Sequence, residues 1–196
     1  MKNLPFCSTS RLMQYLCRCL THYYCIMEKI YGAVERFDGI QKLGRTTYEV
    51  FYGLGEDENG KYQFRQVFNF LPPFEFIKEL ILETINNDVN EKIISGFVWT
   101  AGDGTQYNVW LSMENQQNYK AIYDLAVQTG GQGVLPVMFK FGTTENPTYH
   151  TFETLEELGA FYMQSVAFIQ ATYQQGWQDK DSIDWDDYKH VVEPES

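Results

Sequence analysis

Along the chain, pairs of short segments with alternating apolar and polar residues are each followed by a longer segment in which apolar residues recur every three or four positions. The alternation predicts β-strands, and the longer spacing predicts amphipathic helices. Three such repeats follow one another between residues 46 and 175. One repeat cannot bury its own apolar faces, so the repeats should share a sheet or stack. The pattern predicts an α+β fold of three hairpin-and-helix (ββα) units with antiparallel strands packed against helices.

The first unit is expected to contain strands at 46–52 and 62–70 and a helix at 73–87. Its second strand alternates aromatic with polar residues, which is typical of an antiparallel strand buried on one face. The glycine of Asn59-Gly60 tolerates positive φ and suits the turn between the strands. The polar run at 86–88 is expected to end the helix.

The second unit is expected to contain strands at 93–100 and 106–112 and a helix that ends near Thr129. Ser112 is a candidate N-cap for this helix because its hydroxyl can accept a free backbone N–H. Gly130-Gly131 is a candidate C-cap, since glycine tolerates the left-handed conformation that closes many helices.

The third unit is expected to contain strands at 137–142 and 149–152 and a long helix that ends near Gln175. Thr154 and Glu157 have the spacing of a capping box. The residues predicted to form the apolar face of this helix are Leu158, Phe161, Tyr162, Ser165, Phe168, Ile169 and Tyr173.

The composition suits one globular core and limits the classes of partner. The chain has 196 residues, of which 44% are hydrophobic and 16% aromatic, and its net charge is −11. Nucleic acids and anionic membrane surfaces attract clustered Lys and Arg, so this charge argues against both as partners. No stretch reaches the roughly 18 apolar residues of a membrane span.

The first 26 residues differ sharply from the rest. They contain all four cysteines and three basic residues without an acidic one, which leaves 12 basic and 26 acidic residues in the remainder. A secretory signal is disfavoured because Arg18 and His22 interrupt the apolar run. A metal site is conceivable, but its spacing matches no usual zinc motif. The residues of that candidate site are Cys17, Cys19, His22 and Cys25.

We favour Met27 as the natural start of the protein, and the alternative is a short helical extension. The predicted divisions are an N-terminal extension at 1–26, a first ββα unit at 27–88, a ββαββα domain at 89–184 and an acidic tail at 185–196.

Several short segments of the predicted second domain match the pattern of one family. They are Ile94-Ser95-Gly96-Phe97, the return strand at 106–112, the helix start at 117–119, the strand at 137–141, the helix opening at 152–158 and the closing residues 180–184. With these segments, residues 89–184 resemble an uncharacterised domain family of phages and prophages that occurs in or beside tail-fibre and tail-appendage proteins. The resemblance implies no enzyme activity, and the unit at 44–87 lies outside the family's usual span.

The residues that commonly carry chemistry favour no enzyme and no cofactor. After residue 26 the chain has two histidines, His150 and His190, and no cysteine, so no Cys-His or Ser-His-Asp system is evident. The glycines at 130–133 lack the Lys-Ser/Thr of a phosphate-binding loop. The aspartates at 179–187 lack the Gly and terminal Glu of a calcium loop and are interpreted as solvated.

The aromatic residues leave two functions open. Large aromatic side chains serve as anchors of protein interfaces and as stacking platforms for sugars. The candidates for either role are Trp99, Trp110, Trp177 and Trp185. The first hypothesis is a non-enzymatic phage or prophage structural or assembly protein of the tail region. It would bind a phage structural protein or itself, in the virion or in the host cytoplasm during assembly. The second hypothesis is a carbohydrate-binding module.

The break after residue 26 leads to a first prediction. A variant that lacks residues 1–26 should unfold at the temperature of the full chain, because the removed segment differs in charge and cysteine content from the core. A fall of more than about 4 °C, which corresponds to about 1 kcal/mol, would show that the segment packs on the core. Recovery of that loss with zinc would support the metal site.

Overall fold

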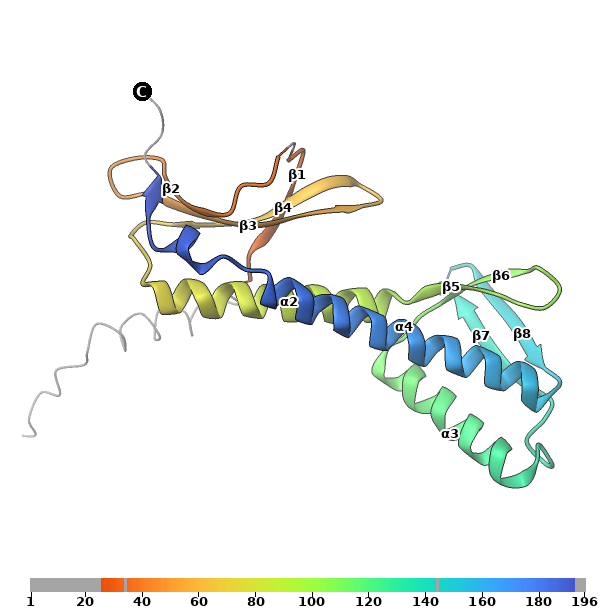
Figure 1. The fold of residues 1–196 in the computed structure, drawn as a ribbon. Helices are drawn as coiled ribbons and strands as arrows, with labels where there is room; N and C mark the ends of the chain where they lie inside the picture. The colour runs from red at the N-terminus through yellow and green to blue at the C-terminus, as the bar shows by residue number, and fades with distance from the viewer. Residues whose placement is uncertain (1–25, 34, 144, 193–196) are drawn as a thin grey trace, which may run out of the picture. The chain divides into compact units, whose positions relative to one another are not determined.

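A computed structural model describes residues 26–33, 35–143 and 145–192 and divides them into two compact units (Figure 1). Unit 2 is Ile85–Ile183, and unit 1 holds the described residues on either side of it. Unit 1 contains β1 (Glu28–Tyr31), β2 (Gly39–Lys42), β3 (Tyr48–Asp57), β4 (Gly60–Phe68), the first half of α2 (Phe74–Ser95), the 3-10 helix η1 (Trp185–Tyr188) and β9 (Val191–Val192). Unit 2 contains the second half of α2, β5 (Phe97–Thr100), β6 (Gln106–Val109), α3 (Met113–Thr129), β7 (Val137–Gly142), β8 (Pro147–Phe152) and α4 (Leu155–Asp181). The predicted α+β class is confirmed.

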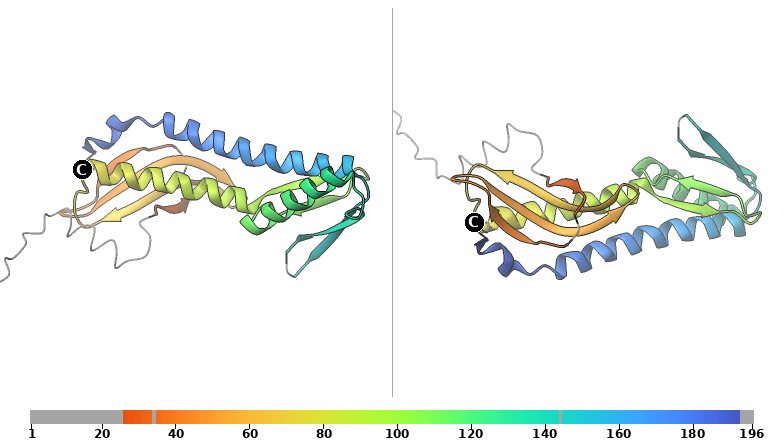
Figure 2. Two further views of the ribbon diagram at one scale, coloured as in Figure 1. Left: turned by 90° about the horizontal axis from the view of Figure 1, so that it is seen from below. Right: turned by 90° about the horizontal axis from the view of Figure 1, so that it is seen from above.

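Unit 1 is built on a five-stranded sheet with the strand order β1-β4-β3-β2-β9. Its central strands are antiparallel, and β9 adds to β2 in parallel. Ile40 pairs with Val50, and Tyr52 pairs with Phe64, so these buried side chains share one face of the sheet. The first half of α2 lies along the sheet (Figures 1 and 2).

The end of the chain, as far as Val192, belongs to this unit, and its aspartates Asp184, Asp186 and Asp187 are exposed as expected. Tyr188 is 1% exposed, and its hydroxyl donates a 3.0 Å hydrogen bond to the carbonyl oxygen of Phe51. The ring of Trp185 meets that of Phe74 edge-on at 6.2 Å. The many aspartates of this segment predict exposure, but the burial of its few apolar residues holds the segment against unit 1.

Helix α2 continues past the polar run that was expected to end it. Ile77, Ile81, Ile85, Val89 and Ile93 recur every four residues and are all buried, so the apolar spacing runs through residues 86–88 unbroken. The helix ends at Ser95, and the next residue is Gly96, whose φ of +73° suits a residue without a Cβ and whose N–H donates to the carbonyl of Lys92 at 3.2 Å. The strand expected to begin at Ile93 begins at Phe97 instead.

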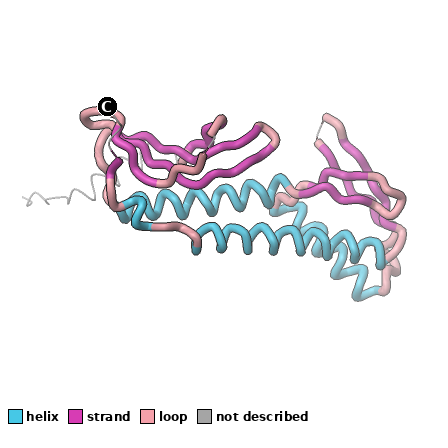
Figure 3. The backbone as a smooth tube through the Cα atoms, turned by 45° about the horizontal axis from the view of Figure 1, so that its top comes forward, coloured by secondary structure: helices cyan, strands magenta, loops and turns pink. Residues whose placement is uncertain are grey.

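Unit 2 consists of two hairpins, β5-β6 and β7-β8, together with helices α3 and α4 and the end of α2 (Figure 3). The inward-facing residues of the hairpins and helices form one aromatic cluster. Its members are Trp99, Tyr107, Tyr119, Phe139, Phe141, Phe152 and Phe161. Phe161 is fully buried, and its ring centroid lies 5.2 Å from that of Trp99 and 5.1 Å from that of Tyr119.

The predicted caps of α3 and α4 are confirmed. Ser112 Oγ accepts the N–H of Asn115 at 3.3 Å, and Gly130 adopts the left-handed conformation with φ of 61°. Thr154 Oγ1 accepts the N–H of Glu157 at 3.2 Å. These contacts fix where the two helices begin and where α3 ends.

Helix α4 buries a narrower face than expected. Leu158, Phe161, Ser165 and Gly176 are buried, whereas Ile169 is only partly buried. At Gly176 an added Cβ would lie 2.4 Å from Val89 Cγ2, so glycine allows α2 to approach α4 within unit 2.

Replacement of Phe161 by Ala should therefore lower the free energy of unfolding by about 3–5 kcal/mol, because it leaves a cavity inside the aromatic cluster. Urea unfolding of the full chain measures this loss. The partly buried Ile169 provides the comparison, and Ile169→Ala should cost clearly less. Equal losses for the two variants would contradict the assignment of the buried face.

Candidate functional site

The four tryptophans proposed from the sequence lie in different environments. Trp99 is 3% exposed and belongs to the core of unit 2. Trp185 is partly buried in unit 1, where Lys78 Nζ lies 5.6 Å from its ring centroid. Trp110 and Trp177 are 50% and 55% exposed. The two tryptophans with substantial exposed surface are therefore both in unit 2.

Trp110 lies at the end of the outer face of the β5-β6 hairpin. In the strand register, Phe97 pairs with Val109, so the next position, Trp110, faces the same side as Val98. Val98 is 55% exposed. This side therefore carries two exposed apolar side chains.

Trp177 lies on α4 one turn after Tyr173, which is 38% exposed. The two rings are nearly parallel, with an interplanar angle of 17° and centroids 6.4 Å apart. Residues that are four positions apart are neighbours on a helix surface, so the pair forms a single aromatic ridge.

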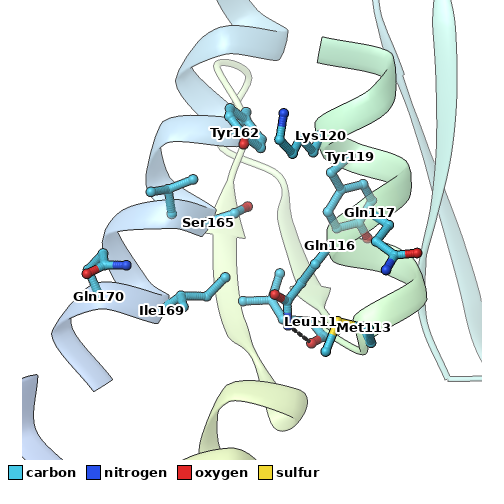
Figure 4. A pocket seen from close by; sticks show the side chains of 11 residues that line it. Leu111, Met113, Gln116, Gln117, Tyr119, Lys120, Tyr162, Ser165, Ile169 and Gln170 are labelled. Atoms are coloured by element: carbon cyan, nitrogen blue, oxygen red, sulfur yellow. Dashed lines mark hydrogen bonds between the residues drawn. The ribbon is translucent and has the colours of Figure 1, made fainter. Parts of the chain in front are cut away.

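A cleft lies beside this ridge, between the first half of α3 and the middle of α4 (Figure 4). Its volume is about 300 Å³, near the lower limit of the size of ligand pockets. The residues that line it are Leu111, Met113, Gln116, Gln117, Tyr119, Lys120, Tyr162, Ser165, Val166, Ile169 and Gln170. These residues differ widely in exposure: Leu111 is fully buried, whereas Met113 is 68% exposed.

The cleft exists because the two helices make their closest aromatic contact near one end of the pair. Tyr123 and Tyr162 stack with centroids 4.6 Å apart, and Gly159 leaves room for the Tyr123 ring, which lies 3.5 Å from an added Cβ. Towards Met113 and Ile169 no comparable ring pair fills the space between the helices among the described residues. At that end the hollow is lined by apolar and amide side chains such as Met113, Gln116 and Ile169.

Three of the polar side chains that line the cleft have contacts within the protein. Gln116 Nε2 donates to the carbonyl of Leu111 at 2.6 Å, and Ser165 Oγ donates to the carbonyl of Phe161 at 3.1 Å. Lys120 forms an ion pair with Asp124 one turn along α3. The lining offers apolar contact and amide groups rather than a free charge.

Charge is absent from the part of α4 that forms the cleft and the ridge. Residues 158–178 contain no Asp, Glu, Lys or Arg, although 21% of the chain is charged. Many of them are exposed, including Met163 at 60% and Trp177 at 55%. Exposed helix faces of globular proteins normally carry charged residues, and depletion of charge marks the centres of protein interfaces. The lack of charge is visible in the sequence, whereas the exposure of these residues depends on the fold.

His150 is held on both sides of its imidazole. Its Nδ1 lies 3.3 Å from the hydroxyl of Tyr107, and its Nε2 lies 2.9 Å from Glu157 Oε1. Its ring meets that of Trp99 edge-on at 4.9 Å. These contacts join β6, β8 and the first turn of α4. In a capping box the carboxylate of Glu157 would accept the backbone N–H of Thr154, but here it contacts His150.

The described residues contain no group of three or more His, Cys, Asp or Glu side chains arranged to hold a metal ion. Asp184, in the aspartate-rich segment, caps η1 by accepting the N–H of Asp186 at 2.9 Å. The candidate ligands Cys17, Cys19, His22 and Cys25 lie outside the described residues. Within the same described part of the chain, every helix is too short or too polar to cross a membrane.

Comparison with known proteins identifies one family. The family described as "Domain of unknown function (DUF4376)" matches residues 77–193, which is more than half of the chain. No curated protein and no solved structure matches the chain. The match begins inside α2 and includes the cleft, the ridge and η1.

Burial in the wall of the cleft raises the pKa of Tyr119 from 10.0 to about 12. A phenol with a raised pKa stabilises the folded state below the unfolded pKa, and this contribution is lost as pH rises through the folded pKa. The wild type should therefore lose stability relative to Tyr119→Phe between about pH 10 and pH 12. Urea unfolding of both proteins across this range measures the difference, and parallel curves would contradict the raised pKa.

Proposed function

The chain belongs to the DUF4376 family of unknown function, and we propose that it is a non-enzymatic structural or assembly protein of a phage or prophage tail. In this proposal it works through protein–protein contacts made by the uncharged surface of α4. The single observation that carries the proposal is that residues 158–178 are uncharged yet substantially exposed.

The physical argument concerns the cost of leaving this surface in water. Tyr173 and Trp177 expose aromatic rings beside a cleft lined largely by apolar groups. Burial of such surface against a partner is favourable by about 25 cal/mol per Å². Aromatic residues that enter hollows are the usual energetic centres of protein interfaces. A surface of this kind suits a protein partner.

The phage setting rests on the resemblance of residues 89–184 to a phage and prophage domain family. One of the segments that carry the resemblance is Ile94-Ser95-Gly96-Phe97, which ends α2 and begins the β5-β6 hairpin. These segments shape the scaffold that carries α4. The protein would act in the virion or in the host cytoplasm during assembly.

The contacts of two ionisable residues of unit 2 also support a role without catalysis. His150 is occupied by Tyr107 and Glu157, and Lys120 is occupied by Asp124. Each of these groups has a contact within the fold, and the residues that line the cleft, with Lys120 as their single charged member, offer no acid–base pair to a substrate.

A carbohydrate-binding module is the second candidate, and the parallel rings of Tyr173 and Trp177 favour it. Sugar rings stack on flat aromatic faces, and the neighbouring Gln174 and Gln178 could bond to hydroxyl groups. The two candidates use the same ridge, so the identity of the bound molecule separates them.

In phage-producing cells, tagged full-length chain should co-purify with an identifiable phage structural protein, and Trp177→Ala should reduce the recovered partner about tenfold or more. Loss of an aromatic anchor at an interface centre commonly costs 2 kcal/mol or more, roughly a thirtyfold change in affinity. Trp110→Ala is the matched control, because Trp110 is equally exposed but lies on the β5-β6 hairpin. It should leave recovery unchanged.

Two results would contradict the assembly role. One is equal loss of partner in both tryptophan variants. The other is a chain that recovers no phage protein but binds a glycan array through Trp177, which would favour the carbohydrate module.

A further inference from the structure

Helix α4 carries a second apolar stripe beside the face that it buries. Its members are Tyr162, Val166, Ile169, Tyr173 and Trp177, which recur every three or four residues. At 100° per residue their mean direction lies about 90° around the helix from that of Leu158, Phe161 and Ser165, which face the core. Tyr162, Val166 and Ile169 are partly buried, and Tyr173 and Trp177 are exposed.

The stripe is divided into a hollow half and a protruding half. Tyr162, Val166 and Ile169 line the cleft against α3. Tyr173 and Trp177 form the ridge, beyond the α4 residues that line the cleft. The two halves lie on either side of Ile169 and Gln170, at the middle of the stripe.

This order makes the surface complementary to itself. If two copies of α4 lie antiparallel with a twofold axis at Ile169 and Gln170, Trp177 of one copy faces Tyr162 of the other, and Tyr173 faces Val166. Each ridge then enters the cleft of the other copy. In a twofold interface, every contact made by one copy is repeated by its partner, so each copy supplies both a hollow, which α3 and α4 line together, and the ridge that fills the hollow of the other copy.

Charge also favours a second copy at this place. The net charge of −11 makes two copies repel each other over most orientations. Residues 158–178 carry no charge, and Lys120, the single charged residue of the cleft, is paired with Asp124. Two copies that meet along α4 therefore bring no carboxylates of these helices face to face until Glu157 and Asp179 at the ends of the run.

We propose that the protein forms a twofold symmetric dimer in which α4 packs antiparallel on α4 of a second copy and Trp177 of each copy fills the cleft of the other. The proposal deepens the proposed function, on which it rests, by naming the chain itself as a partner. The dimer would be the unit that joins a larger assembly.

The decisive position is Gln170, which is exposed, borders the cleft and lies at the proposed axis. Gln170→Glu and Gln170→Lys each place two like charges opposite one another in the dimer. Gln, Glu and Lys have similar helix propensities, so neither variant should disturb α4 itself. Sedimentation equilibrium of the full chain over a range of concentrations measures the dimer dissociation constant.

The wild type should dimerise, and each variant alone should raise the dissociation constant about tenfold or more, because like charges placed together across an interface repel. An equimolar mixture of the Glu and Lys variants should restore dimers, since opposite charges then meet at the axis. Gln106→Glu is the matched control: it makes the same substitution at an exposed position on β6 and should leave dimerisation unchanged.

The proposal would be overturned by a wild type that stays monomeric at every concentration, or by a dimer that neither Gln170 variant weakens. A monomer that still captures a phage protein through Trp177 would remove the self-association and leave the proposed function standing. A dimer that shows the predicted charge behaviour but captures no phage protein would support the self-association and contradict the proposed function.

Discussion

The packing of aromatic rings around Phe161 is the interaction on which the rest of unit 2 depends. The ring of Phe161 is fully buried among Trp99 from β5, Tyr119 from α3 and Phe152 from β8. A two-stranded hairpin is marginally stable by itself in water, so neither hairpin of the unit would persist without this shared core. The cluster also fixes the rotation of α4 about its axis. That rotation leaves the uncharged stripe at the surface and places the cleft between α3 and α4.

Burial and function make different demands on α4. The core needs Leu158, Phe161 and the small Gly176 on one face of α4. This requirement would still be met if the exposed face of the helix carried charged residues. The exposed residues Tyr173, Trp177 and Gln170 lie outside that core. Their presence in an otherwise strongly acidic chain is easier to understand if the surface is covered in the working state.

Much of the fold follows from local sequence patterns, and the failures have physical reasons. The caps at Ser112, Gly130 and Thr154 depend on one residue type at one position, so they were predictable. The length of α2 was not, because a polar run resembles a helix end unless the apolar spacing beyond it is followed. Strands β1, β2 and β9 have only two to four residues and form through pairing with distant parts of the chain. Trp99 and Trp177 look alike in sequence, and only tertiary packing separates the core residue from the exposed one. The uncharged run was readable from the sequence, but its exposure and the cleft required the fold.

Helix α2 has no linker at the boundary between the units. Ile77 and Ile81 belong to the core of unit 1, whereas Ile85, Val89 and Ile93 belong to that of unit 2, and the helix passes from one set to the other without a break. The first turn of a helix is the costly one to form, and later turns add to it at little cost. When one unit folds first, the other unit can therefore extend a helix whose first turns have already formed. The stretch of α2 that crosses the boundary would then speed the folding of the second unit. An insertion there would make each unit form its own part of the helix, so the two would fold independently.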